Sequence, residues 1–397
     1  MRILVVTPCF PAPSSGGARA RTYYLLKTLA RKHRVSLLGV DDRAKIGEVQ
    51  YDTGLLKDLT YTIQLLPQPK ASSRRLQQLM KMLQGRSNTI AELTIGGTQD
   101  ALDTLLSRDR YDVVVFDSAL IAGYRLPENV KVIINQHNIE HELLYRTYLS
   151  ETRWLRKWYN WWESWLVKPI EIEHCQRAEA VLVTSERERL VLKSMLQRSV
   201  IEVVPNGVDI EAFQGNSSEQ GIEGRIIFTG SMSYYPNIHA VHFFAQKCWP
   251  YIRAQIPEAT WHIVGRQPSP EVMKLAELPG ITVTGQVSDM RPYFTEAMVA
   301  IVPLHIGGGT RLKILEALAM RKAVVSTSLG CEGLSVVPGK HLLLADQPEA
   351  FAQAVVELIR SPQTRKALGD AGRSLVEAEY SWERCGDQLL HVLELIQ

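Results

Sequence analysis

The stretch "VAIVPLHIGGGTRLKILEALAM", residues 299–320, joins a β-branched apolar run to a helical pattern through three consecutive glycines. The run at Val299–Val302 has the composition of a buried strand, and Leu312, Leu315 and Ala319 recur at helical spacing on one face. A strand that passes through a loop into a helix is the repeating unit of parallel α/β layers. This stretch therefore predicts an α/β fold.

The same alternation of short β-branched runs and amphipathic stretches extends over the whole chain. It predicts two sets of strands, and each set suffices for a doubly wound parallel sheet. The expected strands of the first half are 3–7, 35–40, 113–117, 130–135, 180–184 and 202–204; those of the second half are 225–229, 261–264, 281–284, 299–302, 323–326 and 342–344.

Length and linker composition indicate two domains. A chain of 397 residues is long for one core, and residues 205–224 are rich in Gly, Asn and Ser without apolar periodicity. We expect a first domain at residues 1–205 and a second at residues 206–378. A C-terminal helix at residues 379–397 is expected to pack back toward the first domain.

Composition excludes several classes of protein. Hydrophobic residues make up 45% and charged residues 22% of the chain, as in ordinary folded domains. The net charge of +3 is too small to predict a nucleic-acid partner. The five cysteines show neither a CxxC pair nor a Cys/His ligand spacing, so no metal site is expected. No signal-peptide pattern and no window of about 18 apolar residues occurs, so we expect a cytoplasmic protein.

Parallel α/β sheets bind ligands beyond the carboxyl ends of their strands, so the residues after each strand are candidates for the site. After the first strand, Gly16 and Gly17 precede a helix, where backbone N–H groups can approach an anion. Arg19 and Arg21 would add positive charge there. The loop does not match GxGxxG, which disfavours a nicotinamide dehydrogenase. A tight turn with exposed arginines is the structural alternative.

The glycine loop at Gly307–Gly309 is the second candidate. Arg311 and Lys313 lie where a helix is expected to begin. The N-terminal end of a helix is positive and disfavours cations, so their presence there favours a bound anion. Without Cβ atoms on the glycines, the amides of Thr310 and Arg311 can donate to a phosphate. The loop is not a Walker A motif. Glu316 lies on another side of the helix and can accept bonds from two sugar hydroxyls. A flexible loop before a solvated helix is the alternative.

Polar residues follow two strands of the first half. His137 and Asn138 come directly after one strand, where an imidazole can bond a substrate hydroxyl or move a proton. Asp117 and Ser118 end another strand. A carboxylate there can orient a polar substrate, and a helix cap is an equal alternative.

Two turns of the second half open on its expected ligand side. One follows a strand at Gly230 and Ser231, and the other contains Gly265 and Arg266. Arg266 is a candidate for phosphate or base contact, with a plain surface position as the alternative.

In this order, the residues at the strand ends resemble the retaining GT-B glycosyltransferases of glycosyltransferase family 4. The resemblance covers nearly the whole chain. Its motifs are "SGGA" (15–18), "QHN" (136–138), "VTSERE" (183–188), "VPNGVD" (204–209), "FTGSM" (228–232), "HIVGR" (262–266) and "GGGTRLKILEALAMRKAVVST" (307–327). It implies two Rossmann-like domains facing across a cleft, with the acceptor side at 1–205 and the nucleotide sugar bound mainly by 206–378.

The sequence departs from the family at its glutamate signature. Two glutamates with seven residues between them are typical, and Glu316 matches the second, which is expected on the ribose. Gly308 stands where the first belongs, so backbone amides of 307–310 are expected to replace that acid. The usual Arg and Lys pair after the "FTGS" strand has no match in "MSYYPN". Arg311, Lys313 or Arg266 are expected to supply its charge.

The resemblance implies transfer of a hexose-type sugar from a nucleoside-diphosphate sugar, with UDP or GDP as the expected base, to a hydroxyl acceptor. His137, Arg311 and Lys313 are expected to be catalytic. Preorganised N–H groups and cations stabilise a departing diphosphate, so no metal or other cofactor is expected. A sugar-nucleotide 2-epimerase is one alternative, suggested only by His137 near Glu140 or Glu142. A non-catalytic sugar-nucleotide-binding protein is the other.

A tryptophan-rich stretch, "RWLRKWYNWWESWLVK" at 153–168, sets Trp154, Trp158, Trp161 and Trp165 on one face of a helix beside basic residues. A second basic amphipathic candidate is 70–86. Both suit a peripheral protein on the inner face of the cell membrane and a lipid-linked glycan acceptor, in polysaccharide or glycolipid synthesis. Packing of the tryptophans at a domain interface is the alternative.

Overall fold

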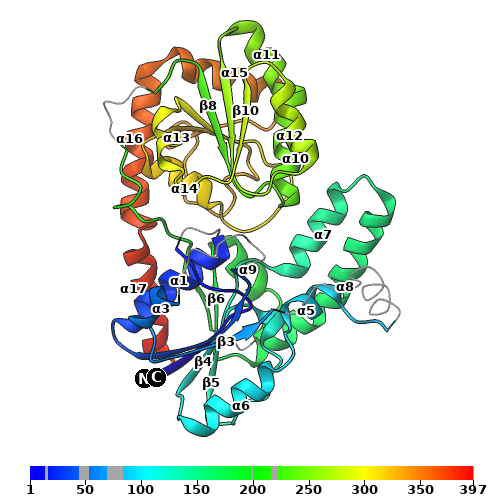
Figure 1. The fold of residues 1–397 in the computed structure, drawn as a ribbon, viewed down its shortest axis with the longest axis vertical. Helices are drawn as coiled ribbons and strands as arrows, with labels where there is room; N and C mark the ends of the chain where they lie inside the picture. Colours follow the sequence, from blue (N-terminus) through cyan, green and yellow to red (C-terminus); the bar gives the residue numbers. More distant parts are fainter. Residues whose placement is uncertain (14–16, 44–52, 69–83, 198–199, 216–220, 397) are drawn as a thin grey trace. The chain divides into compact units, whose positions relative to one another are not determined.

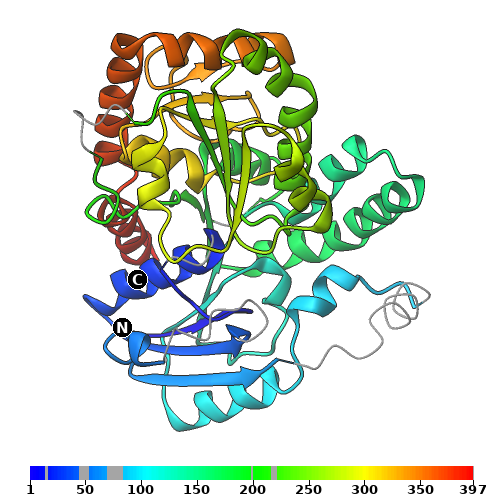
Figure 2. The ribbon, with the colours of Figure 1, turned by 45° about the horizontal axis from the view of Figure 1, so that its top comes forward.

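The computed structural model describes residues 1–13, 17–43, 53–68, 84–197, 200–215 and 221–396. The chain divides into two compact units, of which the first is Met1–Pro205 with Gly386–Gln397 and the second is Asn206–Cys385. Each unit contains a parallel sheet covered by helices (Figure 1, and turned in Figure 2).

The described strands of the first unit form a seven-stranded sheet in the order β3-β2-β1-β4-β5-β6-β7. They are β1 (Arg2–Val6), β2 (Arg34–Asp41), β3 (Thr62–Pro67), β4 (Val113–Phe116), β5 (Lys131–Asn135), β6 (Ala180–Val183) and β7 (Val200–Val203). Strand β3 was not among the predicted strands. Because this edge strand is only partly buried along its length, its sequence lacks the continuous apolar run that marks central parallel strands.

The described helices of the first unit cover its sheet. They are α1 (Gly17–Ala30), α3 (Gly54–Lys57), α5 (Asn88–Leu93), α6 (Thr98–Arg108), η1 (Ala119–Ile121), α7 (Glu140–Ser150), α8 (Trp154–Arg177) and α9 (Glu186–Lys193). Helix α17 (Trp382–Leu395) joins this unit from Gly386 onward. Its residues Leu389 and Leu393 belong to the same hydrophobic core as Ile3 and Val115.

The second unit contains a six-stranded parallel sheet, within the described residues, in the order β10-β9-β8-β11-β12-β13. Its strands are β8 (Arg225–Thr229), β9 (Thr260–Val264), β10 (Ile281–Gly285), β11 (Val299–Val302), β12 (Ala323–Ser326) and β13 (Leu343–Leu344). Its helices are α10 (Tyr235–Phe243), η2 (Phe244–Cys248), α11 (Trp249–Gln255), α12 (Pro270–Met273), η3 (Lys274–Glu277), α13 (Arg291–Glu296), α14 (Leu312–Ala319), α15 (Pro348–Arg360) and α16 (Pro362–Glu379). The predicted strands of this half are all present.

Strand order reverses at one place in each sheet. The chain winds outward from β1 on one side and from β4 on the other in the first unit, and from β8 and β11 in the second. Doubly wound sheets form their ligand crevice beyond the carboxyl ends of the strands at such a switch point. The loops after these four strands therefore define where each unit is expected to bind its ligand.

Candidate active site

The switch point of the second unit is built around Gly230, which follows β8 with a φ of +148°. A Cβ atom there would lie 2.7 Å from Nδ2 of Asn237 and 2.9 Å from Nζ of Lys313. The next strand end is equally close, because a Cβ on Gly265 would lie 1.7 Å from the Gly230 oxygen. Glycine at both positions thus lets two strand ends and a lysine amine come together.

Lys313 lies in the first turn of α14, and its amine reaches the end of β8. Its Nζ donates to Oδ1 of Asn237 at 2.8 Å and lies 4.0 Å from the centroid of the Phe228 ring. Burial, aided by the charge of Arg311, lowers the pKa of Lys313 to about 7. Lys313, which is far from β8 in the sequence, therefore brings its amine to the end of that strand. This is the strand end after which the sequence lacks the family's Arg and Lys pair.

Asn237 was not among the predicted site residues. It holds Lys313 through its oxygen, and its Nδ2 donates to the Ser231 carbonyl at 2.9 Å. Its place in "MSYYPN" gives no sequence signal, because its partner is 76 residues away along the chain.

The glycine loop before α14 has two residues with positive φ, Gly307 at +121° and Gly309 at +70°. The guanidinium of Arg311 donates to the Gly308 carbonyl and so closes over the loop. Thr310 is buried, and its Oγ1 accepts a bond from Nδ2 of Asn206 at 2.8 Å. These contacts fix the loop on both sides, as a preorganised anion site requires.

Glu316 lies three residues after Lys313 on α14 and is partly buried. Burial raises the pKa of Glu316 to about 7, although the charge of Lys313 opposes the shift. The core face of α14 differs from the prediction. Ile314 and Leu318, which were not predicted to face the core, are fully buried, whereas Leu312 is only partly buried.

Arg266 follows β9 and Gly265, in the loop beside the one after β8. Its carbonyl accepts a hydrogen bond from the Met232 amide at 2.9 Å, and the Gly230 amide donates to the Val264 carbonyl at 3.1 Å. The backbone of Arg266 therefore belongs to the same cluster of strand ends as Gly230.

The switch point of the first unit holds a buried carboxylate. Asp117 is 2% exposed, and its Oδ2 accepts bonds from Oγ1 of Thr7 at 2.9 Å and of Thr22 at 2.6 Å. Its Oδ1 accepts from Nδ2 of Asn135 at 2.7 Å and lies 2.9 Å from Nε2 of His137. Both oxygens of Asp117 are therefore engaged within the first unit, and its contact with the His137 ring is one through which it can orient a substrate indirectly. Ser118 caps η1, since its side chain accepts from the Leu120 amide.

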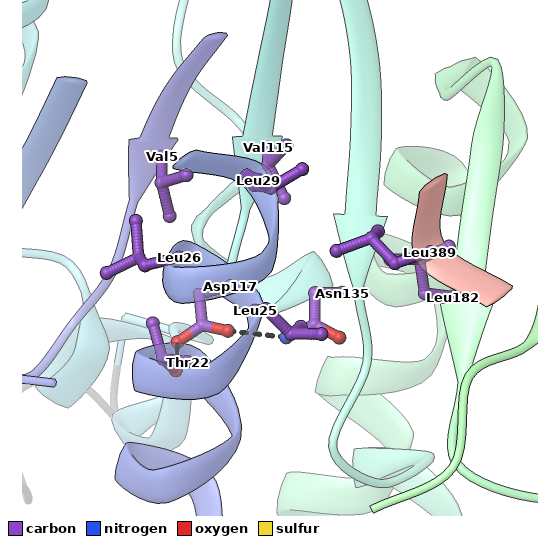
Figure 3. Close-up of a pocket in the computed structure, with 10 residues that line it drawn as sticks. All are labelled: Val5, Thr22, Leu25, Leu26, Leu29, Val115, Asp117, Asn135, Leu182 and Leu389. Atoms are coloured by element: carbon purple, nitrogen blue, oxygen red, sulfur yellow. Dashed lines mark hydrogen bonds between the residues drawn. The ribbon is translucent and has the colours of Figure 1, made fainter. Parts of the chain in front are cut away.

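Apolar packing surrounds this carboxylate. A small cavity beside Asp117 is lined mainly by aliphatic side chains, among them Leu25 and Leu26 of α1 and Leu389 of α17 (Figure 3). Burial alone would raise the pKa of Asp117, but the charge of His137 and the hydrogen bonds outweigh it, so the pKa is lowered. An ionised carboxylate only accepts, so Nε2 of His137 carries a proton, and Nδ1 is the other ring nitrogen, which Asp117 does not contact.

Residues after β5 form a second polar group. Burial and the charge of Glu171 raise the pKa of Glu140 to about 8, with an opposing hydrogen bond from Asn138. Glu171 is buried and accepts a bond from the Glu140 amide at 2.9 Å. Glu142 is in ion pairs with Arg146 and Arg187. Of the two acids that suggested an epimerase, Glu142 is thus committed to structural pairs.

The arginines after the first strand differ from expectation. Arg19 pairs with Asp42, and Arg21 is fully buried, where it donates to Oδ1 of Asn135 at 2.9 Å and to the Val204 carbonyl at 2.6 Å. The charge of Arg19 is therefore paired within the unit, and the alternative of exposed arginines does not hold for Arg21. Gly17 begins α1, and Gly16 lies outside the described residues.

The tryptophans at 154, 158, 161 and 165 are exposed side chains on α8. Of the second basic stretch, 70–86, only residues 84–86 fall within the described part of the chain. In the part that the structure describes, no helix is both long enough and apolar enough to cross a bilayer.

Two family models match the chain. Residues 15–212 match Glycosyltransferase Family 4, and residues 223–361 match Glycosyl transferases group 1. A curated relative from Corynebacterium glutamicum, a GDP-mannose-dependent monoacylated alpha-(1-6)-phosphatidylinositol monomannoside mannosyltransferase, is 26% identical over 215 residues. The match covers 49% of this chain and 56% of the relative, so the chain spans about half of that relative's length.

Solved structures share the fold over the full length. Sucrose-phosphate synthase from Thermosynechococcus elongatus superposes with a TM-score of 0.74 at 18% identity and covers 100% of this chain and 99% of its own. Anabaena HepE in complex with UDP-glucose gives a TM-score of 0.67 at 14% identity and 99% coverage of both chains. The predicted GT-B fold is confirmed, and the chain belongs to the family 4 glycosyltransferases.

Proposed function

We propose that this protein is a retaining glycosyltransferase that moves a hexose-type sugar from a nucleoside-diphosphate sugar to a hydroxyl acceptor. The observation that carries the proposal is the meeting of the Lys313 amine with Gly230 at the switch point of the second unit. The glycine loop and Arg311 precede the same helix. Cations beside backbone without Cβ atoms suit a diphosphate, which needs both charge and close approach.

The chemistry follows from the charges that develop. The bond from the anomeric carbon to the diphosphate oxygen breaks, and the diphosphate keeps the electron pair. Lys313, Arg311 and the amides of 307–310 then stabilise that negative charge, which lowers the barrier. The acceptor oxygen bonds the anomeric carbon on the same face, and its proton passes to the departing phosphate oxygen. We propose that no divalent metal is needed, because these groups supply the positive charge.

Glu316 and His137 have separate proposed roles. The Glu316 carboxylate, on the same helix as Lys313, accepts hydrogen bonds from the ribose hydroxyls of the donor. His137 bonds a hydroxyl of the sugar substrate through Nδ1, because Asp117 occupies Nε2. Asn138 is proposed as a further polar contact for the sugar. Arg266, and Gly17 at the start of α1, are proposed as further contacts for the donor.

For the nucleotide base of the donor and for the acceptor, we propose classes of compound and not single compounds. UDP and GDP are both supported, because the HepE structure contains UDP-glucose and the Corynebacterium relative is named for GDP-mannose. That relative is also named for a phosphatidylinositol-linked acceptor. The exposed tryptophans of α8 agree with a lipid-linked glycan acceptor on the inner face of the cell membrane, in polysaccharide or glycolipid synthesis.

The test is to incubate the protein with UDP-, GDP-, ADP- and dTDP-sugars and to follow release of the nucleoside diphosphate and isomerisation of the sugar. Release from one donor that rises with an added acceptor supports the transferase. Isomerisation without release would identify an epimerase, and binding without turnover a non-catalytic protein. Either of these results rejects the proposal.

A further inference from the structure

We propose that the hairpin of α7 and α8 is a docking surface for anionic lipid, with exposed tryptophans entering the membrane interface and basic residues contacting the headgroups. The two helices pack against each other and extend side by side from the sheet of the first unit (Figures 1 and 2). This inference rests on the membrane contact in the proposed function and names its lipid class and its residues.

The apolar part of the surface is a stripe along α8. Trp154, Trp158, Trp161 and Trp165 are between 42% and 75% exposed, and their spacing places them on one helical face. Trp162 stacks against Trp158 and Trp165, with ring centroids 5.9 Å and 5.4 Å apart, which holds these indoles in a row. Tryptophans presented together in this way are typical of helices that lie in a membrane interface.

Exposed apolar side chains also flank the turn between the two helices. Leu149, near the end of α7, is 59% exposed, and Leu155, at the start of α8, is 62% exposed. The tip of the hairpin therefore presents aliphatic side chains to its surroundings, as an interfacial anchor does.

The charges of this surface decide its partner. Arg153, directly before α8, and Arg156 and Lys168 on α8 are exposed, and Lys157 lies over the Tyr148 ring of α7 at 5.2 Å. Helical spacing places Lys157 and Lys168 next to the tryptophan stripe, three positions after Trp154 and Trp165. Cations beside exposed indoles complement the negative headgroups of an anionic leaflet.

The two acids within residues 151–168 face inward. Glu151 is 5% exposed. Glu163 is fully buried, where its carboxylate accepts bonds from the hydroxyl of Ser87 at 2.7 Å and from the amides of Asn88 and Thr89 at 3.0 and 3.1 Å. The fold thus uses Glu163 to cap α5 and leaves the exposed face of residues 153–168 with cations as its charged groups. A neutral or basic protein partner would not require this arrangement.

The test is co-sedimentation of the full chain with vesicles of phosphatidylcholine alone and with about one third phosphatidylglycerol. We expect binding to the anionic vesicles that weakens as salt rises. Trp154→Ser with Trp165→Ser should lower the partition coefficient by about tenfold or more. Arg153→Gln with Lys168→Gln should lower it by about fivefold per charge. Leu190→Ser, an equally exposed apolar position on α9, is the matched control and should bind like the parent.

Thermal melting checks that each variant is folded, and donor hydrolysis without vesicles separates this inference from the proposed transfer. Variants that lose vesicle binding and keep hydrolysis support the surface, and the surface also stands if no donor turns over but binding depends on the tryptophans. Equal binding of all variants, or no binding to anionic vesicles, overturns it. Self-association in the absence of lipid that the tryptophan variant abolishes would assign the face to a second copy and also overturn it.

Discussion

Nε2 of His137 lies 2.9 Å from Oδ1 of Asp117, a carboxylate that three further side chains also hold from inside the first unit. The contact joins the ends of β4 and β5, which are adjacent strands of the sheet. Because the ionised carboxylate can only accept, it keeps a proton on Nε2 of His137.

Replacing Asp117 by Asn is expected to disturb both His137 and the fold. An amide can donate as well as accept, so it permits the other tautomer, and we expect sugar transfer to fall by roughly tenfold or more with little change in donor affinity. The lost charge-assisted bonds should lower the free energy of unfolding at pH 7 by about 1–3 kcal/mol. Steady-state kinetics and urea unfolding measure the two effects.

The stability effect has a defined pH dependence. The pKa of Asp117 is lower in the folded state than its ordinary value of 3.8, so its stabilising contribution is present above that value and is lost as pH falls through the folded pKa. The gap between parent and variant should therefore shrink in acid. Asp112→Asn, on an exposed residue of the same unit, is the control and should cost less. A gap that stays constant down to pH 2 would contradict the assignment.

Removing the amine of Lys313 should weaken donor binding. Lys313→Ala deletes a charged donor to the diphosphate, and we expect a loss of about 1.5–3 kcal/mol in binding of the nucleoside diphosphate, measured by calorimetry. Lys340→Ala, at an exposed position of the same unit, should leave affinity unchanged. Equal affinity of the Lys313 variant and the parent would reject the anion site.

Donor affinity should peak near pH 7. The Lys313 ammonium is lost as pH rises through about 7, and a bound diphosphate raises that pKa, so affinity should fall by up to about tenfold per pH unit on the alkaline side. The Glu316 carboxylate is lost as pH falls below about 7, which weakens ribose binding in acid. Lys313→Arg should flatten the alkaline limb and Glu316→Gln the acid limb. A Lys313→Arg profile identical to the parent would refute the assignment.

Gly230→Ala should displace Lys313. The added Cβ would meet both Asn237 and the Lys313 amine. The φ of residue 230, +148°, also disfavours a residue with a side chain. We expect donor affinity to fall at least tenfold, roughly as in Lys313→Ala. Gly285→Ala isolates the backbone effect, because φ is +71° there and a Cβ would have open space. If both variants lowered affinity equally, backbone strain and not displacement of the lysine would be the cause.

Metal independence has a direct measurement. Turnover with the donor that the panel identifies should be the same, within about twofold, after treatment with a chelator and after addition of Mg²⁺ or Mn²⁺, because protein cations stabilise the leaving diphosphate. Loss of activity with chelator that Mn²⁺ restores would contradict this proposal.

Local sequence pattern was sufficient to predict the layers of the fold. Central strands such as Val113–Phe116 and Val299–Val302 are buried on both faces, so they are continuous apolar runs that local pattern reveals. Edge strand β3 was not predicted, because it is partly exposed and its sequence lacks a continuous apolar run. The glycine loop and Glu316 were visible for a similar reason, since a strand, loop and helix follow one another along the chain.

The internal partners of these polar residues follow from tertiary structure and not from the local pattern. Arg19 and Arg21 were predicted to add positive charge for an anion, but the packing of the unit pairs Arg19 with Asp42 and buries Arg21 against the Asn135 amide. Lys313 meets Asn237 across 76 residues of sequence. Such contacts depend on where long-range strand order places each side chain, and a one-dimensional pattern contains periodicity but not that placement.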